Sequence, residues 1–117
     1  RLEILLDTEN YQIGPHTDAP HKTFSMLIYL PRDRSQLDLG TSIYVPKMAD
    51  FRSEKATQFP FDWFQRHRRF DFAPNSAMCF MKTDQSFHGR EPVTGPATAR
   101  HLMQLAFINR DMAEGGE

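Results

Sequence analysis

The residues best suited to do chemistry in this chain are two histidines and an aspartate from two separate segments. His16 and Asp18 stand two positions apart in residues 16–20, and His88 follows much later in residues 86–90. Two neutral imidazoles and one carboxylate can occupy one face of an octahedral iron(II) ion and leave the opposite positions open for a co-substrate and dioxygen. The three side chains are therefore candidate metal ligands.

The local context of these three residues favours a shared site. A His-x-Asp pair is short enough to arise by chance, and the alternative is that three unrelated polar residues lie on loops. Here, however, the pair closes a predicted strand at 10–15 and precedes another strand, so side chains two positions apart can turn toward the same point. His88 also follows a predicted turn and strand. The histidines at 21, 67 and 101 have no such context and are interpreted as structural.

Length and composition indicate a single globular domain. The 117 residues are 39% hydrophobic and 25% charged, with a formal net charge of −1, which is typical of a folded domain. A charge so close to zero gives no general attraction to nucleic acid or to anionic membranes. The sequence shows no signal peptide, no lipidation motif and no apolar run of membrane-spanning length, so we expect a cytoplasmic location and no membrane partner.

The chain contains one cysteine, Cys79. It has no partner for an internal disulfide. Its apolar setting in residues 77–81 predicts a small buried side chain rather than a reactive thiol.

Short extended segments separated by turn residues predict an all-β fold. Hydrophobic periodicity, together with breakers such as Pro31, Gly40 and Pro46, divides most of the chain into strands. We place these strands near residues 2–7, 10–15, 23–30, 40–45, 68–73, 76–82, 85–89 and 99–109. Eight strands in this arrangement suit a double-sheet jelly roll, whose interior can enclose a metal.

One segment departs from the strand pattern. Residues 47–67 are charged at the start, interrupted by Pro60 and aromatic at the end, which predicts a loop with a short helix. We therefore expect one domain over residues 1–117, with an excursion at about 47–67.

Two predicted strands are apolar on both faces, and each face needs cover. In the last strand, Arg100 and Gln104 mark the face that looks into a cavity, while the opposite face is apolar. The strand at 23–30 has the same two-sided character. Since a jelly-roll interior covers one side only, we expect the other side to be covered by helices that precede Arg1 in a longer protein, or by a homo-oligomer contact.

Taken as an ordered set, these segments resemble the catalytic core of the Fe(II)/2-oxoglutarate-dependent dioxygenases. The similarity spans residues 11–107. The matching motifs are His16-Thr17-Asp18, the strand at 25–31, Leu39-Gly40-Thr41, Pro74-Asn75 with Phe80, His88-Gly89 with Pro92-Val93, and Arg100. The resemblance implies a double-stranded β-helix, a form of jelly roll that N-terminal helices usually flank in this family.

The resemblance also implies roles for the site residues. His16, Asp18 and His88 would hold Fe(II). Arg100 would bind the distal carboxylate of 2-oxoglutarate through a planar, two-pronged pair that a lysine cannot reproduce. Arg90, two residues beyond His88, is a rival for that role, but the family's arginine usually starts the last strand, as Arg100 does.

A second contact to 2-oxoglutarate must come from a position other than the one that the family often uses. The family often has a Ser or Thr two residues after the arginine, whereas this chain has Leu102. The candidates are Tyr11, Tyr29 and Gln104, although Tyr29 also suits an ordinary core aromatic.

The implied activity is the oxidative decarboxylation of 2-oxoglutarate, with dioxygen as the second co-substrate, coupled to hydroxylation of another molecule. No side-chain general acid or base is expected beyond the metal ligands. The sequence leaves that other molecule open. Aromatic residues within 47–72 stand beside the basic run 66–69, a combination that can bind single-stranded nucleic acid or an anionic metabolite. The same residues could instead form a solvated face with packed aromatic rings. A peptidyl-prolyl substrate is a further alternative. We expect a small molecule, because the basic run is short and the net charge is near zero.

Two other classes of protein share parts of this pattern. A cupin-like metal protein could use the same cage for redox-neutral chemistry, but it would not need Arg100. A non-catalytic jelly-roll binding module would need no intact metal triad.

Overall fold

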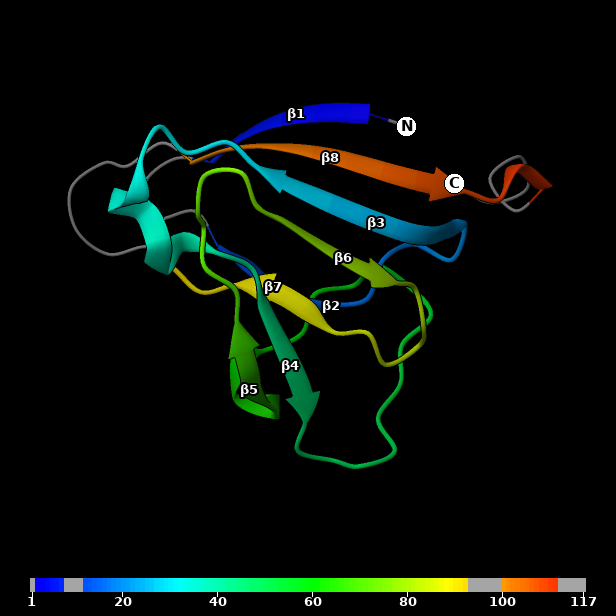
Figure 1. Ribbon diagram of the computed structural model, residues 1–117. Helices are drawn as coiled ribbons and strands as arrows, with labels where there is room; N and C mark the ends of the chain where they lie inside the picture. Colours follow the sequence, from blue (N-terminus) through cyan, green and yellow to red (C-terminus); the bar gives the residue numbers. More distant parts are fainter. Residues whose placement is uncertain (1, 8–11, 93–99, 112–117) are drawn as a thin grey trace.

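Antiparallel strands build the part of the chain that the structure, a computed structural model, describes: residues 2–7, 12–92 and 100–111. The strands are β1 (Leu2–Asp7), β2 (Ile13–His16), β3 (Lys22–Tyr29), β4 (Ser42–Pro46), β5 (Phe64–Arg69), β6 (Ala77–Met81), β7 (His88–Arg90) and β8 (Arg100–Ile108). They form two four-stranded sheets, with the orders β1-β8-β3-β6 and β2-β7-β4-β5. Figure 1 shows the first sheet above the second. The predicted all-β class is confirmed.

The pairing follows a simple rule in which strands from the two halves of the chain meet. β1 pairs with β8, β2 with β7, β3 with β6 and β4 with β5, all antiparallel. The further pairs β3–β8 and β4–β7 join these into sheets. In the β2–β7 pair, His16 lies opposite His88. The topology thus brings together the two motifs that stand far apart in the sequence.

Most predicted strands lie within a few residues of the observed ones, but the prediction for β5 was wrong. It was placed at 68–73, whereas the strand runs from Phe64 to Arg69. β5 is the edge strand of its sheet, and all of its residues after Phe64 are exposed. An edge strand with such a polar run lacks the alternation that marks a half-buried strand. Phe72, within the predicted range, lies in the loop after the strand.

Two short 3-10 helices lie within residues 12–92. η2 (Phe61–Trp63) follows Pro60 and is the short helix expected in the excursion, which therefore ends at Trp63 rather than at 67. η1 (Arg34–Leu39) was not predicted; its start is capped by Asp33, whose side chain accepts a hydrogen bond from the Ser35 amide at 2.9 Å. None of the helices in the described residues is long and apolar enough to cross a membrane.

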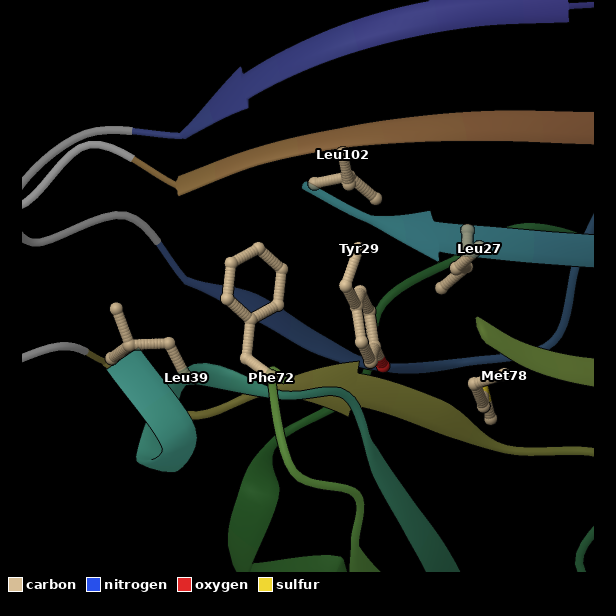
Figure 2. Packing of buried hydrophobic residues seen from close by; sticks show 6 residues of the cluster. All are labelled: Leu27, Tyr29, Leu39, Phe72, Met78 and Leu102. Atoms are coloured by element: carbon tan, nitrogen blue, oxygen red, sulfur yellow. The ribbon is translucent and has the colours of Figure 1, made fainter. Parts of the chain in front are cut away.

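The main hydrophobic core fills the space between the sheets. Figure 2 shows its buried members, which are Leu27, Tyr29, Leu39, Phe72, Met78 and Leu102. A second cluster joins Tyr44, Phe64 and Phe87, with Phe51 of the excursion stacked on Phe87 at 5.6 Å between ring centroids. The excursion is thereby packed onto the lower sheet of Figure 1.

The outer face of the β1-β8-β3-β6 sheet is apolar and exposed. Leu2, Ile4, Met81 and Phe107 each have more than half of their surface accessible. The prediction that Cys79 is buried was wrong, because β6 turns this side chain to the same outer side, where it is exposed. The two-sided apolar character inferred from the sequence is thus present, and cover of this face by helices or an oligomer stays a prediction.

Truncation of Phe72 tests the core. Phe72 is completely buried in the main cluster, so Phe72→Ala removes a large packed ring and should lower the free energy of unfolding by about 3–5 kcal/mol. Phe107→Ala is the matched control, since Phe107 is mostly exposed, and should change it by less than about 1 kcal/mol. Denaturant unfolding monitored by circular dichroism measures both. Equal effects of the two variants would contradict the placement of this core.

Candidate metal centre

Three side chains from β2, the following turn and β7 converge at one point. His16 is the last residue of β2, Asp18 lies two positions further, and His88 is the first residue of β7. One ligand atom of each residue lies within 4.8 Å of the others. The Nε2 atoms of His16 and His88 are 3.8 and 3.4 Å from Oδ1 of Asp18. The predicted triad is thus brought together and is placed to bind a metal ion.

Backbone hydrogen bonds orient both imidazoles. Nδ1 of His16 lies 2.9 Å from the carbonyl oxygen of Gly14, and Nδ1 of His88 lies 3.0 Å from that of Ser86. A carbonyl can only accept a hydrogen bond, so Nδ1 of each ring carries the proton and donates it. Nε2 of each ring is then left to face Asp18 and to bind a metal once it carries no proton, and the outer hydrogen bond fixes the ring.

The two oxygen atoms of the Asp18 carboxylate have different partners. Its Oδ1 faces the two imidazoles, while its Oδ2 accepts a 3.0 Å hydrogen bond from the hydroxyl of Ser25 on β3. Asp18 is almost fully buried. Since the bond to Ser25 joins the two sheets, the upper sheet sets the orientation of a ligand that belongs to the lower one.

The electrostatic surroundings favour the protonation states that bind metal. Burial lowers the pKa of His16 below its usual value, and the neighbouring His88 lowers it further. For Asp18, burial alone would raise the pKa. The hydrogen bond and charge of His88, with smaller help from Lys22 and Ser25, outweigh burial, and the pKa lies well below its ordinary value. A neutral imidazole and an ionised carboxylate are the forms that coordinate a cation.

Thr17, between the two ligands, points the other way and anchors the excursion. Its buried hydroxyl donates to the carbonyl of Ser53 at 2.8 Å. The ammonium group of Lys82 donates to Thr17 Oγ1 at 2.9 Å and to the carbonyl of Thr83 at 3.0 Å. The polypeptide that carries His16 and Asp18 is therefore fixed from both sides.

Sequence reasoning missed Ser25 and Lys82, although the signal for Ser25 was present. Ser25 shares a strand face with Leu27 and Tyr29, and a small polar residue on the inner face of a strand indicates a buried partner. No comparable pattern marked Lys82, whose contacts depend on how the excursion packs.

A cavity opens from the triad into the space between the sheets. Its charged and polar wall includes Lys22, Arg90, Arg100 and Gln104, and its apolar wall includes Ile13, Leu27, Phe80 and Leu102. The prediction that Arg100 and Gln104 share the cavity face of the last strand is confirmed. The rival Arg90 also lines the cavity, so both arginines lie near the metal centre.

Arg100 is deeply buried and held in a fixed orientation. It is only 3% exposed, its Nη1 donates to the carbonyl of Leu39 at 2.6 Å, and its guanidinium carbon lies 5.3 Å from the ring centre of Phe72. Arg100 thus contributes a buried positive charge to the wall of the cavity.

Two tyrosines were predicted to contact 2-oxoglutarate, Tyr29 and Tyr11. Tyr29 is part of the main core, and its hydroxyl accepts a 3.1 Å hydrogen bond from the backbone amide of Thr41. It is not among the residues that line the cavity, because a side chain that packs on Phe72 at 4.7 Å between ring centres is directed into the core. A contact between Tyr29 and 2-oxoglutarate stays a prediction. Tyr11 lies outside the described residues.

Two glycines in the motifs are required by close backbone approach. A Cβ at Gly89 would lie 2.4 Å from the carbonyl oxygen of Ile13, and one at Gly40 would lie 1.6 Å from that of Phe70. Gly89 thus lets β7 approach β2 closely enough for His88 to face His16.

A scan against protein-family models, a search of curated proteins and a search of solved structures each returned no match. The assignment of the site therefore depends on the geometry above.

Removal of the Ser25 hydroxyl tests how Asp18 is oriented. Ser25→Ala leaves Oδ2 of Asp18 without its hydrogen bond and should weaken metal binding by about tenfold to a hundredfold, as loss of outer-sphere partners does elsewhere. Ser35→Ala, in the exposed helix η1, should leave the affinity unchanged. A competition titration of Co²⁺ or Mn²⁺ against a chelating dye measures both. Wild-type affinity in Ser25→Ala would show that the hydrogen bond has no part in the metal centre.

Proposed function

We propose that this protein is a non-haem Fe(II) oxygenase that couples the decarboxylation of 2-oxoglutarate to hydroxylation of a small molecule. The observation that carries the proposal is the convergence of His16, Asp18 and His88 on one face of a cavity that also contains a buried arginine. Two imidazoles and a carboxylate leave open positions on iron. The donor set fits Fe(II), because the ligands are nitrogen and oxygen atoms only and number three.

The fold proposed with this function is a jelly roll of the double-stranded β-helix type. Two observations support this fold. Strands from the start of the chain pair with strands from its end, as β1 does with β8 and β2 with β7. The eight described strands also divide equally between two facing sheets. Such folding of one long hairpin produces a double-sheet jelly roll. The proposed metal centre lies where β2 and β7 meet, on the inner side of the β2-β7-β4-β5 sheet.

The protein's residues would position the reactants. Iron, when bound, supplies the activation of dioxygen and the oxidative decarboxylation of 2-oxoglutarate to succinate and carbon dioxide. Arg100 would hold the distal carboxylate of 2-oxoglutarate, because its guanidinium is buried and its plane is fixed by Leu39 and Phe72. Gln104, on the same cavity face of β8, would donate a second hydrogen bond. We prefer Arg100 to Arg90 because it starts the last strand, as the family's arginine does.

The apolar wall has a separate part in this proposal. Phe80 packs on the ring of His88 at 4.2 Å between centres, and Leu27 and Leu102 continue the apolar surface. These side chains would limit the access of water to a bound metal.

The basic run 66–69 is not required for this function. It forms the exposed edge strand β5, where Arg66 pairs with Glu91 at 2.9 Å and Arg68 lies over the ring of Phe70 at 4.6 Å. The nearby aromatic residues pack on one another, for example Phe51 on Phe59 at 5.0 Å between centres. These contacts support a solvated strand beside a packed aromatic cluster, and hence a small-molecule substrate rather than nucleic acid.

An anaerobic titration tests the proposal. Fe(II) followed by 2-oxoglutarate should give the visible charge-transfer band of a metal chelate. Asp18→Ala should remove iron binding and with it the band. Arg100→Ala should keep iron and weaken 2-oxoglutarate by at least about tenfold, because a buried charge pair is lost. Arg68→Ala, on the exposed edge strand, is the control and should behave as wild type.

Each departure from this pattern has a distinct meaning. Absence of the band in the wild-type protein would reject the oxygenase and favour a redox-neutral metal protein or a binding module. If Arg90→Ala, rather than Arg100→Ala, weakened 2-oxoglutarate, the carboxylate would belong to Arg90. If Asp18→Ala and Arg100→Ala behaved alike, the division of roles would be wrong.

A further inference from the structure

A lysine in the cavity wall has no part in the function proposed so far. Lys22 is half-buried at the start of β3 and lines the same cavity as the three metal ligands. Its backbone amide donates to the carbonyl of Ala19 at 3.0 Å, which closes the turn after Asp18. Within the described part of the chain, its ammonium group forms no ion pair with a carboxylate.

A β-bulge directs Lys22 into the cavity. In regular alternation along β3, Lys22 would lie on the same outer face as Phe24 and Met26. The pairing with β8 is shifted, however, because Lys22 is opposite Ile108 while Phe24 is opposite Phe107. Two steps on β3 thus match one step on β8, and such a bulge redirects a side chain. Lys22 therefore turns to the inner face, which is otherwise lined mainly by apolar residues.

Lys22 and Arg100 lie at opposite ends of this inner face, with the metal ligands between them. Tyr29, at the far end of β3, is opposite Leu102, next to Arg100. The Cα atoms of Lys22 and Tyr29 are roughly 20 Å apart at the usual rise of an extended strand. Ser25, which holds Asp18, lies between the two ends. A 2-oxoglutarate held between the metal and Arg100 would therefore extend away from Lys22.

The charge of Lys22 itself calls for an anionic partner. Among the described residues that line the cavity, the one carboxylate is that of Asp18, which already faces the two imidazoles and Ser25. A bound divalent metal would engage this carboxylate and add positive charge beside Lys22. A low-dielectric cavity with excess positive charge attracts anions.

We propose that Lys22 binds an anionic group of the primary substrate, a carboxylate or a phosphate, on the side of the metal centre opposite Arg100. The inference rests on the proposed function, because it takes the Arg100 end to be occupied by 2-oxoglutarate. On this proposal, the substrate is a small molecule with a carboxylate or phosphate group, and Lys22 binds that group at the start of β3.

Two simple anions test this assignment. Protein loaded with Mn²⁺ and saturating 2-oxoglutarate is titrated with acetate or with inorganic phosphate, while the paramagnetic relaxation of the acetate methyl protons or of the phosphorus nucleus is measured. Wild-type protein should show saturable relaxation enhancement by at least one anion. Lys22→Met should weaken that binding by at least about tenfold, since one partner of a charge pair is removed. Lys22→Arg should retain it, and Lys47→Met, at an exposed lysine outside the cavity, should match wild type.

The results separate the two proposals. The preferred anion identifies the group as carboxylate or phosphate. No saturable binding of either anion, or equal binding by Lys22→Met and wild type, would overturn the assignment of Lys22. Loss of the Fe(II)–2-oxoglutarate band in Lys22→Met would also overturn it, because the lysine would then bind the co-substrate. A band missing from the wild-type protein would contradict the proposed function itself.

Discussion

The antiparallel pairing of β2 with β7 is the contact on which the candidate site depends. It places His16 opposite His88, so two histidines far apart in the sequence present Nε2 atoms to one carboxylate. The pairing in turn requires Gly89, because a side chain there would collide with the carbonyl of Ile13. The same backbone supplies the carbonyls that orient both rings. The geometry of the three ligands thus depends on the strand register, and a slip of one residue would destroy this geometry.

A buried carboxylate beside two imidazoles is costly unless it is compensated. The hydroxyl of Ser25 compensates part of the charge of Asp18 from the opposite sheet, and the imidazoles compensate it at Oδ1. Thr17 and Lys82 fix the intervening backbone against the excursion. The centre is therefore held by both sheets and by residues 53–55, and a divalent cation would complete its charge balance.

The sequence predicted those parts of the structure that depend on local pattern. The triad follows from the types of its residues and their strand context, and the cavity face of β8 and most strand positions follow from periodicity and turn residues. Asn75, whose φ of 58° is in the left-handed region, lies in the turn before β6 and is of a residue type that favours such turns. The parts that failed depend on tertiary context. β5 is an edge strand without alternation, and Cys79 lies on an exposed sheet face. The inward turn of Lys22 depends on a bulge, which single-strand periodicity does not reveal.

The central claim is that the triad holds iron with positions open for 2-oxoglutarate and dioxygen. Labelled dioxygen tests it most directly: Fe(II)-loaded protein with 2-oxoglutarate is exposed to ¹⁸O₂, and the succinate formed is analysed by mass spectrometry. The account predicts one ¹⁸O atom in each succinate molecule, and no succinate from the Asp18→Ala protein. Unlabelled succinate, or consumption of 2-oxoglutarate that persists without Asp18, would contradict it.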